Sequence, residues 1–458
     1  MSKTILAIDI GSTKICAVTA QINEENSLTL TGAGVVKSQG IKKGSITNIE
    51  LASKSIKKAV EDAKRVSGSS IKSAIVSISG AYTKSSNSKA IVNIQTKEIS
   101  LKDIQRVMKT SLYNANIPNE HEVLHVLPYN FKVDEQDFIE DPLGMNASRL
   151  EVDTHIITTQ KSNLNNLKKA VNGAGIEVEN VVLNSYASSI STLNDDEKEL
   201  GVVLIDMGGH TSNMVIHSGN GIRYNDFLGV GSYHVTNDIS MAFHTPLSMA
   251  ENVKINYASL LEPTDALIEL PVIGDEANKQ EVSLEIVHNV IYARVEETLM
   301  ILAQFIENSG LKEQIGAGIV LTGGFSKMEG IKELASATFG SIPVRLAKPV
   351  EIDGLFDGIK TPEFSTVIGL VKYSSCAYTP YEIDVNKVVR HGTEISNENT
   401  AINFKKEQEH HVVPSVADEV IQEDEKPQMV QIEKEVQKNK NDEAGALKKF
   451  MNWATQLF

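Results

Sequence analysis

Two similar segments, far apart in the chain, constrain the fold more than any other feature of the sequence. Residues 7–18 read AIDIGSTKICAV, and residues 204–215 read LIDMGGHTSNMV. Each segment is an apolar strand that delivers an Asp, turns on a glycine and returns into a second apolar strand. Asp9 is thereby aligned with Asp206, and Gly11 with Gly208. The repetition predicts two related lobes, each organised around the same hairpin.

Both turns carry the groups that a phosphate site needs. Successive backbone N–H groups around a glycine turn form a concave site for phosphate oxygens, and nearby hydroxyls add donors. One turn on each side of a triphosphate would leave Asp9 and Asp206 near its far end, where they would hold a hydrated Mg²⁺. An ordinary hairpin is the simpler interpretation of either turn alone, but the pair favours phosphate binding. The contacts predicted here are Asp9, Gly11, Ser12, Thr13, Lys14, Asp206, Gly208, Gly209, His210 and Thr211.

Charge and cysteine content narrow the class of protein. The net charge of -15 argues against a nucleic-acid partner, because phosphate contacts need a basic surface. Cys16 and Cys376 are the only cysteines, which argues against a disulfide scaffold or a thiolate metal site. The sequence shows no signal-peptide pattern at its start and no apolar run of transmembrane length, so we expect a soluble, intracellular body.

The order of the predicted elements divides the first lobe in two. Strands at 4–9, 15–21 and 28–36, a helix at 49–66 and a strand at 74–79 follow one another, an order typical of each half of an actin-like ATPase. These elements form the first part of the first lobe, 1–81. A Ser-, Asn- and Lys-rich stretch from Tyr82 then predicts an inserted α/β subdomain at 82–160, with its first strand near 90–94 and a capping-box spacing at Ser100 and Asp103. The first lobe resumes at 161–197.

The second lobe is predicted as a core, at 198–229 and 301–385, around a small subdomain at 230–300. Helices are predicted in this lobe at 238–243, at 249–257 and, as one long helix, at about 284–308. Glu251 and Lys254 lie at (i, i+3) on a predicted helix, where a solvated ion pair is the simpler interpretation. Residues 318–331 predict a buried strand, the glycine pair Gly323 and Gly324, and a helix start. Adjacent glycines allow an adenine or ribose to lie against bare backbone, although a tight strand-to-helix turn is the alternative.

The last part of the chain changes in composition. Residues 386–443 are rich in Glu, Lys, Gln and Asn and predict a flexible acidic linker; its His410 and His411 lack further ligands, which favours solvated side chains over a metal site. Residues 444–458 predict an amphipathic helix that binds anionic lipid weakly and reversibly, with docking on a protein as the alternative. The predicted membrane-binding residues are Leu447, Lys448, Lys449, Phe450, Met451, Trp453, Leu457 and Phe458.

These features together resemble the actin and heat-shock-chaperone ATPase superfamily and, within it, the FtsA family of bacterial cell division proteins. The motifs HVLP at 125–128, DPLGM at 141–145 and RLEV at 149–152 carry the closest resemblance. It runs through most of residues 1–380 and returns at the tail. It implies an α/β, actin-like two-lobe ATPase fold with duplicated ribonuclease-H-like lobes, an inserted small α/β subdomain and a C-terminal amphipathic helix.

The resemblance also implies cofactors and partners. ATP and Mg²⁺ would be the cofactors, with further nucleotide contacts from Glu251, Lys254, Gly323, Gly324 and Ser326. The chain would polymerise with itself, receive the C-terminal peptide of FtsZ on residues 230–300 with Arg294 as the best single contact, and help recruit later division proteins. Polymerisation would gather many weak tails and so attach the division ring to the cytoplasmic face of the plasma membrane.

Two departures from the family pattern bear on activity. His210 stands where a third glycine is usual, and we expect it to be tolerated because His is enriched at positive φ. Segment 184–189 has no carboxylate, so Glu179 and Asn180 are the nearest candidates to position an attacking water, and we expect weak or no ATPase activity. A sugar or metabolite kinase and a pilus or polar scaffold ATPase are the alternative functions; the insert and the tail fit them less well. A chaperone would need a β-rich domain in place of the linker.

Overall fold

The computed structural model describes residues 3–23, 27–219, 221–340, 342–354, 357–376 and 378–391, with only the backbone described at 276 and 277. The amphipathic helix predicted at 444–458 and almost all of the acidic linker lie outside the described residues. None of the described helices combines the length and the apolar character needed to cross a bilayer.

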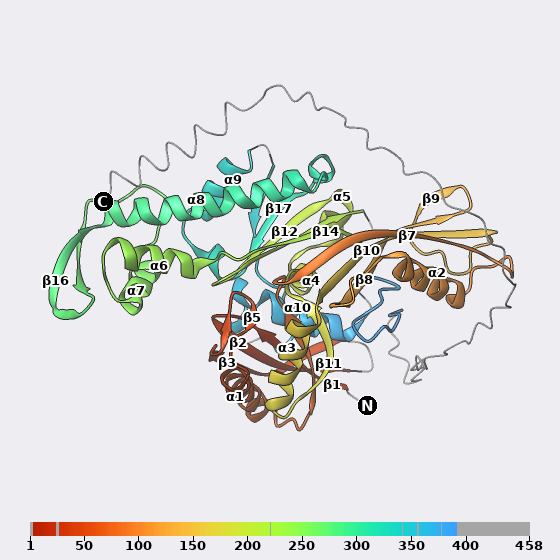
Figure 1. Cartoon of the computed structure of the whole chain (residues 1–458), viewed down its shortest axis with the longest axis horizontal. Helices are drawn as coiled ribbons and strands as arrows, with labels where there is room; N and C mark the ends of the chain where they lie inside the picture. The colour runs from red at the N-terminus through yellow and green to blue at the C-terminus, as the bar shows by residue number, and fades with distance from the viewer. Residues whose placement is uncertain are drawn as a thin grey trace, which may run out of the picture. The chain divides into compact units, whose positions relative to one another are not determined.

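Two sheets of the same topology form the two lobes (Figure 1). In each sheet the first three strands pair antiparallel and the remaining two add in parallel. The predicted duplication is therefore confirmed strand by strand. The first sheet runs β3 (Leu28–Lys37), β2 (Lys14–Ile22), β1 (Lys3–Ile10), β6 (Ser73–Ile78) and β11 (Glu177–Leu183); the second runs β14 (Gly221–Leu228), β13 (Ser212–Ser218), β12 (Val202–Met207), β17 (Gly318–Thr322) and β18 (Val344–Leu346).

Helix α1 (Ile49–Ser67) covers the first sheet as its apolar spacing predicts. Asn48 caps its first turn, and Gly68 ends it in the left-handed conformation. The helix lies so close to β3 that a Cβ atom at Gly34 would fall 2.1 Å from the carbonyl oxygen of Ala59. Glycine is therefore required at this contact. The same lobe contains β4 (Ile41–Lys42), β5 (Ser45–Ile46), α3 (Lys161–Gly173) and α4 (Asn184–Thr192). Helix α5 (Asp195–Leu200) packs on β13 of the second sheet.

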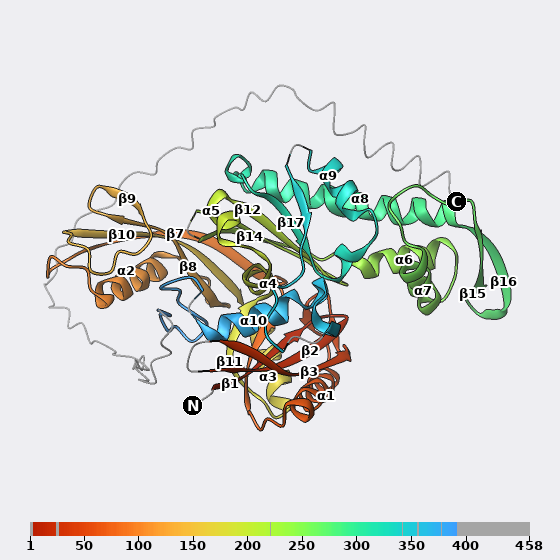
Figure 2. The same cartoon turned by 180° about the vertical axis from the view of Figure 1, so that it is seen from behind.

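The insert is a four-stranded sheet with one helix, and it lies at the opposite end of the body from the small subdomain of the second lobe (Figures 1 and 2). Its first strand begins at Thr83, so the prediction of a strand near 90–94 starts too late. The Ser- and Asn-rich residues before Ala90 pair with β10 as an edge strand with one exposed face, where polar side chains are tolerated. The elements are β7 (Thr83–Asn93), α2 (Leu101–Asn114), β8 (His121–Val133), β9 (Gln136–Ile139) and β10 (Arg149–Gln160).

The small subdomain of the second lobe is built on the long helix α8 (Leu284–Asn308), whose predicted bounds are confirmed. Its hairpin, β15 (Leu267–Val272) with β16 (Asp275–Ser283), was not predicted. Helix α6 begins at Ser232, before the predicted start at 238, and the N–H of Ser232 bonds to the phosphate turn at Gly208. The remaining elements of the lobe are α6 (Ser232–Ala242), α7 (Leu247–Tyr257), α9 (Ile331–Thr338) and the 3-10 turns η1 (Lys312–Gln314), η2 (Gly324–Lys327), η3 (Asp357–Ile359) and η4 (Pro362–Phe364). Helix α10 (Ser365–Ser375), predicted in the core of the second lobe, packs instead on β1, β2 and β6 of the first sheet.

Two helices cross where the lobes meet. A Cβ atom at Gly369 of α10 would lie 1.7 Å from the carbonyl oxygen of Ala187 in α4, so the crossing requires glycine. The chain then returns to the insert, where Ile383 bridges to Val126. Residues 386–391 still belong to the body, because the guanidinium of Arg390 donates to carbonyl oxygens of α10 and its end. The linker boundary predicted at 386 is therefore too early.

Candidate functional site

A cavity of about 670 Å³ lies between the two lobes, within the size range of small-molecule sites. It is lined by both predicted phosphate turns and by the glycine pair. The structure thus brings together residues from four distant parts of the chain. The predicted nucleotide contacts on its wall are Asp9, Gly11, Ser12, Thr13, Lys14, Asp206, Gly208, Gly209, His210, Thr211, Glu251, Lys254, Gly323 and Gly324.

The two turns have the same hydrogen bond at the same position. The N–H of Gly11 donates to the carbonyl oxygen of Lys14 at 3.1 Å, and the N–H of Gly208 donates to that of Thr211 at 2.8 Å. This equivalence supports the alignment of Gly11 with Gly208. Thr13 and Gly209 of the two turns approach one another from opposite lobes, so a phosphate chain bound here would have donors on both sides.

The two carboxylates sit at the ends of their strands in buried, hydroxyl-lined positions. Ser77 donates to Asp9 at 2.9 Å, while Ser188 and Thr366 donate to the same oxygen of Asp206 at 2.5 and 3.0 Å. Burial raises the pKa of both groups, and the charge of Asp9 raises that of Asp206 further. A cation between them would stabilise both charged forms.

This donor set fits Mg²⁺ held largely by water and phosphate. Across the described parts of the chain, no group of three or more His, Cys, Asp and Glu side chains gathers as a metal cage. Two carboxylates with open positions suit an ion that keeps several waters and takes the rest of its oxygens from a substrate phosphate. Asp9 and Asp206 are the residues that would hold it.

Three buried polar atoms on or near the cavity wall have no hydrogen-bond partner among the described residues: Asn184 Oδ1, His210 Nδ1 and Glu363 Oε2. Unpartnered buried polar atoms are rare in folded proteins. A ligand with both donors and acceptors, such as a nucleotide, fits this wall. Asn184 was not predicted as a site residue.

Lys14 and Ser12 already have partners within the protein. The ammonium of Lys14 donates to the carbonyl oxygen of Glu363 at 2.5 Å and lies 4.0 Å from the centre of the Phe364 ring. The Ser12 hydroxyl accepts the N–H of Gly44 at 2.9 Å. Lys14 therefore links its own turn to η4.

Gly323 of the glycine pair makes a close contact within the protein, whereas the sequence predicted a contact with adenine or ribose. Gly323 has a φ of 87°, and a Cβ atom there would fall 2.4 Å from both Asp206 Oδ1 and the carbonyl oxygen of Met207. Glycine is thus required for the approach to the second carboxylate. Ser326 does not line the cavity; its buried hydroxyl donates to the carbonyl oxygen of Gly323 at 2.7 Å and fixes the turn.

Glu251 and Lys254 form more than a solvated pair. Their charged atoms are 2.7 Å apart, and the Lys254 side chain is only 11% exposed. Thr236 of α6 donates to Glu251 at 2.5 Å and accepts from Lys254 at 3.0 Å. The pair therefore ties α7 to α6 beside the cavity.

His210 fits its turn without the positive φ that we expected, since it is not among the non-glycine residues with positive φ. Its ring stacks on Tyr233 of α6, with centroids 4.4 Å apart and planes at 20°. The two turn residues before His210 are bonded to the same helix, because Ser232 and Tyr233 donate their N–H groups to the carbonyl oxygens of Gly208 and Gly209. Tertiary packing, not a special backbone conformation, accommodates the imidazole.

The two water-positioning candidates lie elsewhere. Neither Glu179 nor Asn180 is among the described residues that line the cavity. Asn180 donates to Asp384 at 2.8 Å, and Glu179 accepts from Ser73 at 3.3 Å near the start of β6. The two side chains form hydrogen bonds with the first sheet and the C-terminal segment. Their closeness in sequence to segment 184–189 therefore does not place them at the cavity.

Arg294, the predicted partner contact, is a link between α6 and α8. It donates to both oxygens of Asp238, at 2.5 and 3.2 Å, and also contacts Glu297. Donation to the Asp238 carboxylate raises the pKa of Arg294. An incoming carboxylate would share the guanidinium with these two acids.

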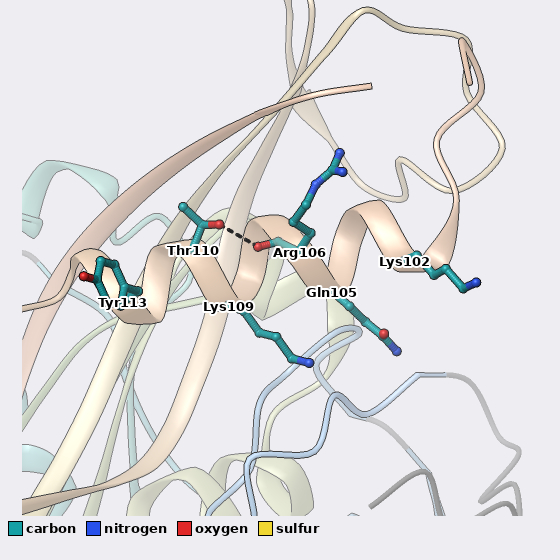
Figure 3. A pocket seen from close by; sticks show the side chains of 6 residues that line it. All are labelled: Lys102, Gln105, Arg106, Lys109, Thr110 and Tyr113. Carbon is teal, nitrogen blue, oxygen red and sulfur yellow. Dashed lines mark hydrogen bonds between the residues drawn. The ribbon is translucent and has the colours of Figure 1, made fainter. Parts of the chain in front are cut away.

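A second hollow, of about 370 Å³, lies along α2 of the insert (Figure 3). Lys102, Gln105 and Lys109 project from one side of the helix, and Tyr113 at its end is 90% exposed. Within the part of the chain that the structure describes, no acidic side chain pairs with Lys102 or Lys109, whereas Arg106 is paired with Asp103. This is a basic surface on an otherwise acidic chain.

Known proteins resemble the chain along most of its length. A family model described as the SHS2 domain inserted in FtsA matches residues 80–158, and one described as cell division protein FtsA matches residues 203–369. Cell division protein FtsA of Helicobacter pylori is 40% identical over 419 residues, covering 84% of this chain and 85% of that protein. The Pseudomonas aeruginosa protein of the same name is 38% identical over 374 residues, covering 81% and 89%.

One solved structure supports the fold alone. The PilM–PilN type IV pilus biogenesis complex aligns with a TM-score of 0.59 at 16% identity, covering 81% of this chain and 98% of that chain.

Proposed function

We propose, from the premise that this chain belongs to the FtsA family of cell division proteins, that it is an ATP-binding adaptor which polymerises and attaches FtsZ to the cytoplasmic face of the plasma membrane. The observation that carries the proposal is the cavity whose wall holds both phosphate turns and both strand-end carboxylates. Such a cavity between two duplicated lobes allows a bound nucleotide to set the lobe arrangement, and hence polymerisation.

ATP with Mg²⁺ is the proposed ligand. Mg²⁺ supplies charge neutralisation of the phosphates when bound. Asp9 and Asp206 orient that ion, the N–H groups of the two turns hold the phosphates, and the residues around Gly323 hold the adenosine. Hydrolysis is weak or absent in this proposal, because Glu179 and Asn180 are not on the cavity wall.

Nucleotide-dependent assembly tests this proposal. Asp9→Ala removes one carboxylate, and Gly208→Val places a side chain whose Cβ lies 3.0 Å from the Thr211 carbonyl oxygen. Gly358→Val is a matched control, because a Cβ atom there meets no described atom within 4 Å. Pelleting with Mg²⁺ and ATP should recover polymer from the unaltered chain and the control but not from the other two. Unchanged polymer in all four would refute the assignment.

The small subdomain of the second lobe is the proposed receptor for the C-terminal peptide of FtsZ. Arg294 supplies a positive charge there, and Met241 on α6 is exposed one turn beyond Asp238. Anisotropy with a labelled peptide from the C-terminus of the same organism's FtsZ should show weaker binding to Arg294→Gln. Equal binding by Arg294→Gln and the unaltered chain would exclude this residue as a contact.

The tail at 444–458 is the proposed membrane anchor, on the sequence pattern described above. Co-sedimentation with vesicles that contain anionic lipid should recover the full chain. A chain that ends at Glu443 should stay in the supernatant. If both sediment equally, the tail is not the anchor.

The insert is the proposed contact for later division proteins and for neighbouring protomers. Its α2 face carries the exposed Tyr113 together with Lys102 and Lys109, which have no acidic partner among the described residues. This face is suited to an acidic partner surface. Lys102→Glu with Lys109→Glu should weaken such complexes without changing ATP binding, which takes place at the other site.

A further inference from the structure

The insert belongs to the first lobe in sequence, but the residues that lead into it are bonded to the second lobe. Ser79 and Gly80, here called the root, lie between β6 and β7. The N–H of Gly80 donates to Asn213 Oδ1 of β13 at 2.9 Å, and the Ser79 hydroxyl donates to the same oxygen at 3.4 Å. A Cβ atom at Gly80 would fall 2.9 Å from the Cβ atom of Phe227 in β14. The root therefore lies directly against the second sheet.

The contact at the root continues a row of side chains that begins at the second carboxylate of the cavity. Asp206, Asn213 and Phe227 stand directly opposite one another on β12, β13 and β14. Opposite residues on neighbouring strands project from the same face of a sheet. Asn213 is buried and also lines the cavity. One cross-strand row thus joins the carboxylate proposed to hold Mg²⁺ to the root of the insert.

A second set of contacts joins the sheet of the insert to β14, which runs beside β8 and β10 (Figures 1 and 2). His155 Nε2 of β10 lies 2.9 Å from Asn225 Oδ1 of β14, and both residues are buried. The guanidinium of Arg223 in β14 lies 4.9 Å from the centre of the Tyr129 ring in β8. The insert is therefore attached to the second lobe at two places, its root and its sheet.

The first lobe holds the other side of the insert. Leu124, Leu127 and Ile157 pack into the core of the first lobe, and the N–H of Leu183 in β11 donates to His125 Nε2 at 3.1 Å. Because the insert contacts both lobes, a change in the angle between them cannot leave all of these contacts intact. The polar contacts with the second lobe include the root itself, and a buried donor that loses its acceptor is costly.

We propose that a change in lobe angle on nucleotide binding is transmitted through Asn213 and Asn225 to the insert, which then shifts relative to the first lobe. This inference rests on the proposed function and deepens it, because it makes the insert a regulatory part that reports the nucleotide state outside the cavity. Coupling between two sites is reciprocal. A protein that binds the insert and favours its shifted position must therefore raise the affinity for ATP by the same factor.

Distance measurement by electron paramagnetic resonance on the full chain tests the inference. Nitroxide labels at Val66→Cys, at the end of α1, and at Tyr113→Cys, on α2, report the position of the insert relative to the first lobe. Both positions are exposed. Cys376→Ser removes the more accessible native thiol, and Cys16 is buried. We expect the distance between the labels to change by at least about 2 Å when Mg·ATP is added, the size of a domain rearrangement.

Arg223→Ala with Asn225→Ala removes the contacts between β14 and the sheet of the insert. Neither residue is among the described residues on the cavity wall, so this variant should still bind Mg·ATP but show a smaller change in distance. Asn130→Ala is a matched control, because this asparagine bonds to Asp137 and Asp153 within the insert. The control should keep the full change.

Three outcomes would overturn the inference and leave ATP binding standing. The labels in the unaltered chain could keep one distance although calorimetry shows that Mg·ATP is bound. The change could persist undiminished in the Arg223 and Asn225 double variant, or it could be lost to the same extent in the Asn130 control. Failure of the unaltered chain to bind Mg·ATP would instead overturn the proposed function, and this inference with it.

Discussion

Thr13 and Gly209 are in direct contact across the cleft: a Cβ atom added at Gly209 would fall 1.9 Å from Thr13 Oγ1. One residue belongs to the turn of the first lobe and the other to the turn of the second. The approach depends on the absence of a side chain at Gly209. The separation of the two phosphate turns is therefore set by a contact that a single methyl group would disrupt.

Gly209→Ala should push the turns apart and weaken ATP. The new methyl group cannot share space with the Thr13 hydroxyl, so one lobe must shift, and phosphate donors on the two sides no longer converge. Calorimetry with Mg·ATP should show a loss of at least about tenfold, the size of one lost charged hydrogen bond. Thr13→Ala in the same chain should recover part of the loss, because it removes the obstructing atoms. Additive losses in the double variant would contradict a steric cause.

Asp206→Asn should preserve the stability of the metal-free protein and abolish its stabilisation by Mg²⁺ with ATP. Burial raises the pKa of Asp206, so the charged carboxylate at neutral pH opposes folding unless a cation is present. An asparagine oxygen still accepts from Ser188 and Thr366. Thermal unfolding in EDTA should thus occur at the same or a higher temperature than in the unaltered chain. The rise that Mg²⁺ with ATP gives the unaltered chain should disappear, and a strong loss of stability in EDTA would count against this account.

The fold could be predicted from sequence where periodicity is strong and local. Helix α8 keeps an apolar face from Val287 to Ile306, and its ends were found. Strand β7 was placed late, because its polar residues are permitted only by its position at a sheet edge. The start of α6 was missed for a related reason: Gly231 offers no side-chain cap, and the first N–H groups of the helix bond to the turn at Gly208 instead.

The residues of the candidate site could likewise be predicted only where the signal is local in sequence. The residues of the two hairpins were predicted because a strand, an Asp and a glycine turn lie together in sequence. Ser188 and Thr366, which donate to Asp206, come from α4 and α10 and meet only after the lobes have assembled. Single hydroxyls within buried helices carry no local signal of such a role. The misplacement of Glu179 and Asn180 shows the converse, since nearness along the chain did not become nearness in space.

Glu382→Ala should destabilise the junction of the insert with the lobes. The fully buried carboxylate accepts from Tyr373 at 2.9 Å and Tyr186 at 3.1 Å and lies 2.7 Å from His125 Nδ1. Because His125 Nε2 accepts the N–H of Leu183, the proton lies on Nδ1 and points to Glu382. Removal of the acceptor leaves the buried donors of His125 and Tyr373 unpaired, while Tyr186 keeps the Thr379 hydroxyl at 2.8 Å. We expect a cost of about 3–5 kcal/mol in the free energy of unfolding.

Urea unfolding measures this cost against a surface pair of the same C-terminal segment. Glu122 pairs with Lys387 at 3.4 Å in a partly exposed position. Glu122→Ala should cost less than about 1 kcal/mol, as exposed pairs do. Similar losses for the two variants would mean that the buried network contributes no more than a surface contact.

Acid should weaken the attachment of the insert to the second sheet through His155. This buried ring of β10 lies 2.9 Å from oxygens of both Asn87 and Asn225, and burial lowers its pKa to about 4. The unfolded imidazole titrates near pH 6.5, so between pH 6.5 and 4 the unfolded chain binds more protons and stability falls as the pH falls. From neutral pH to pH 5 this one group should lower the free energy of unfolding by about 2 kcal/mol. In urea unfolding over the same pH range, the free energy of unfolding of His155→Gln should fall by that much less. Asn87→Ala keeps the ring and should retain the full pH dependence. Equal pH dependence in all three chains would show that His155 is not the titrating group.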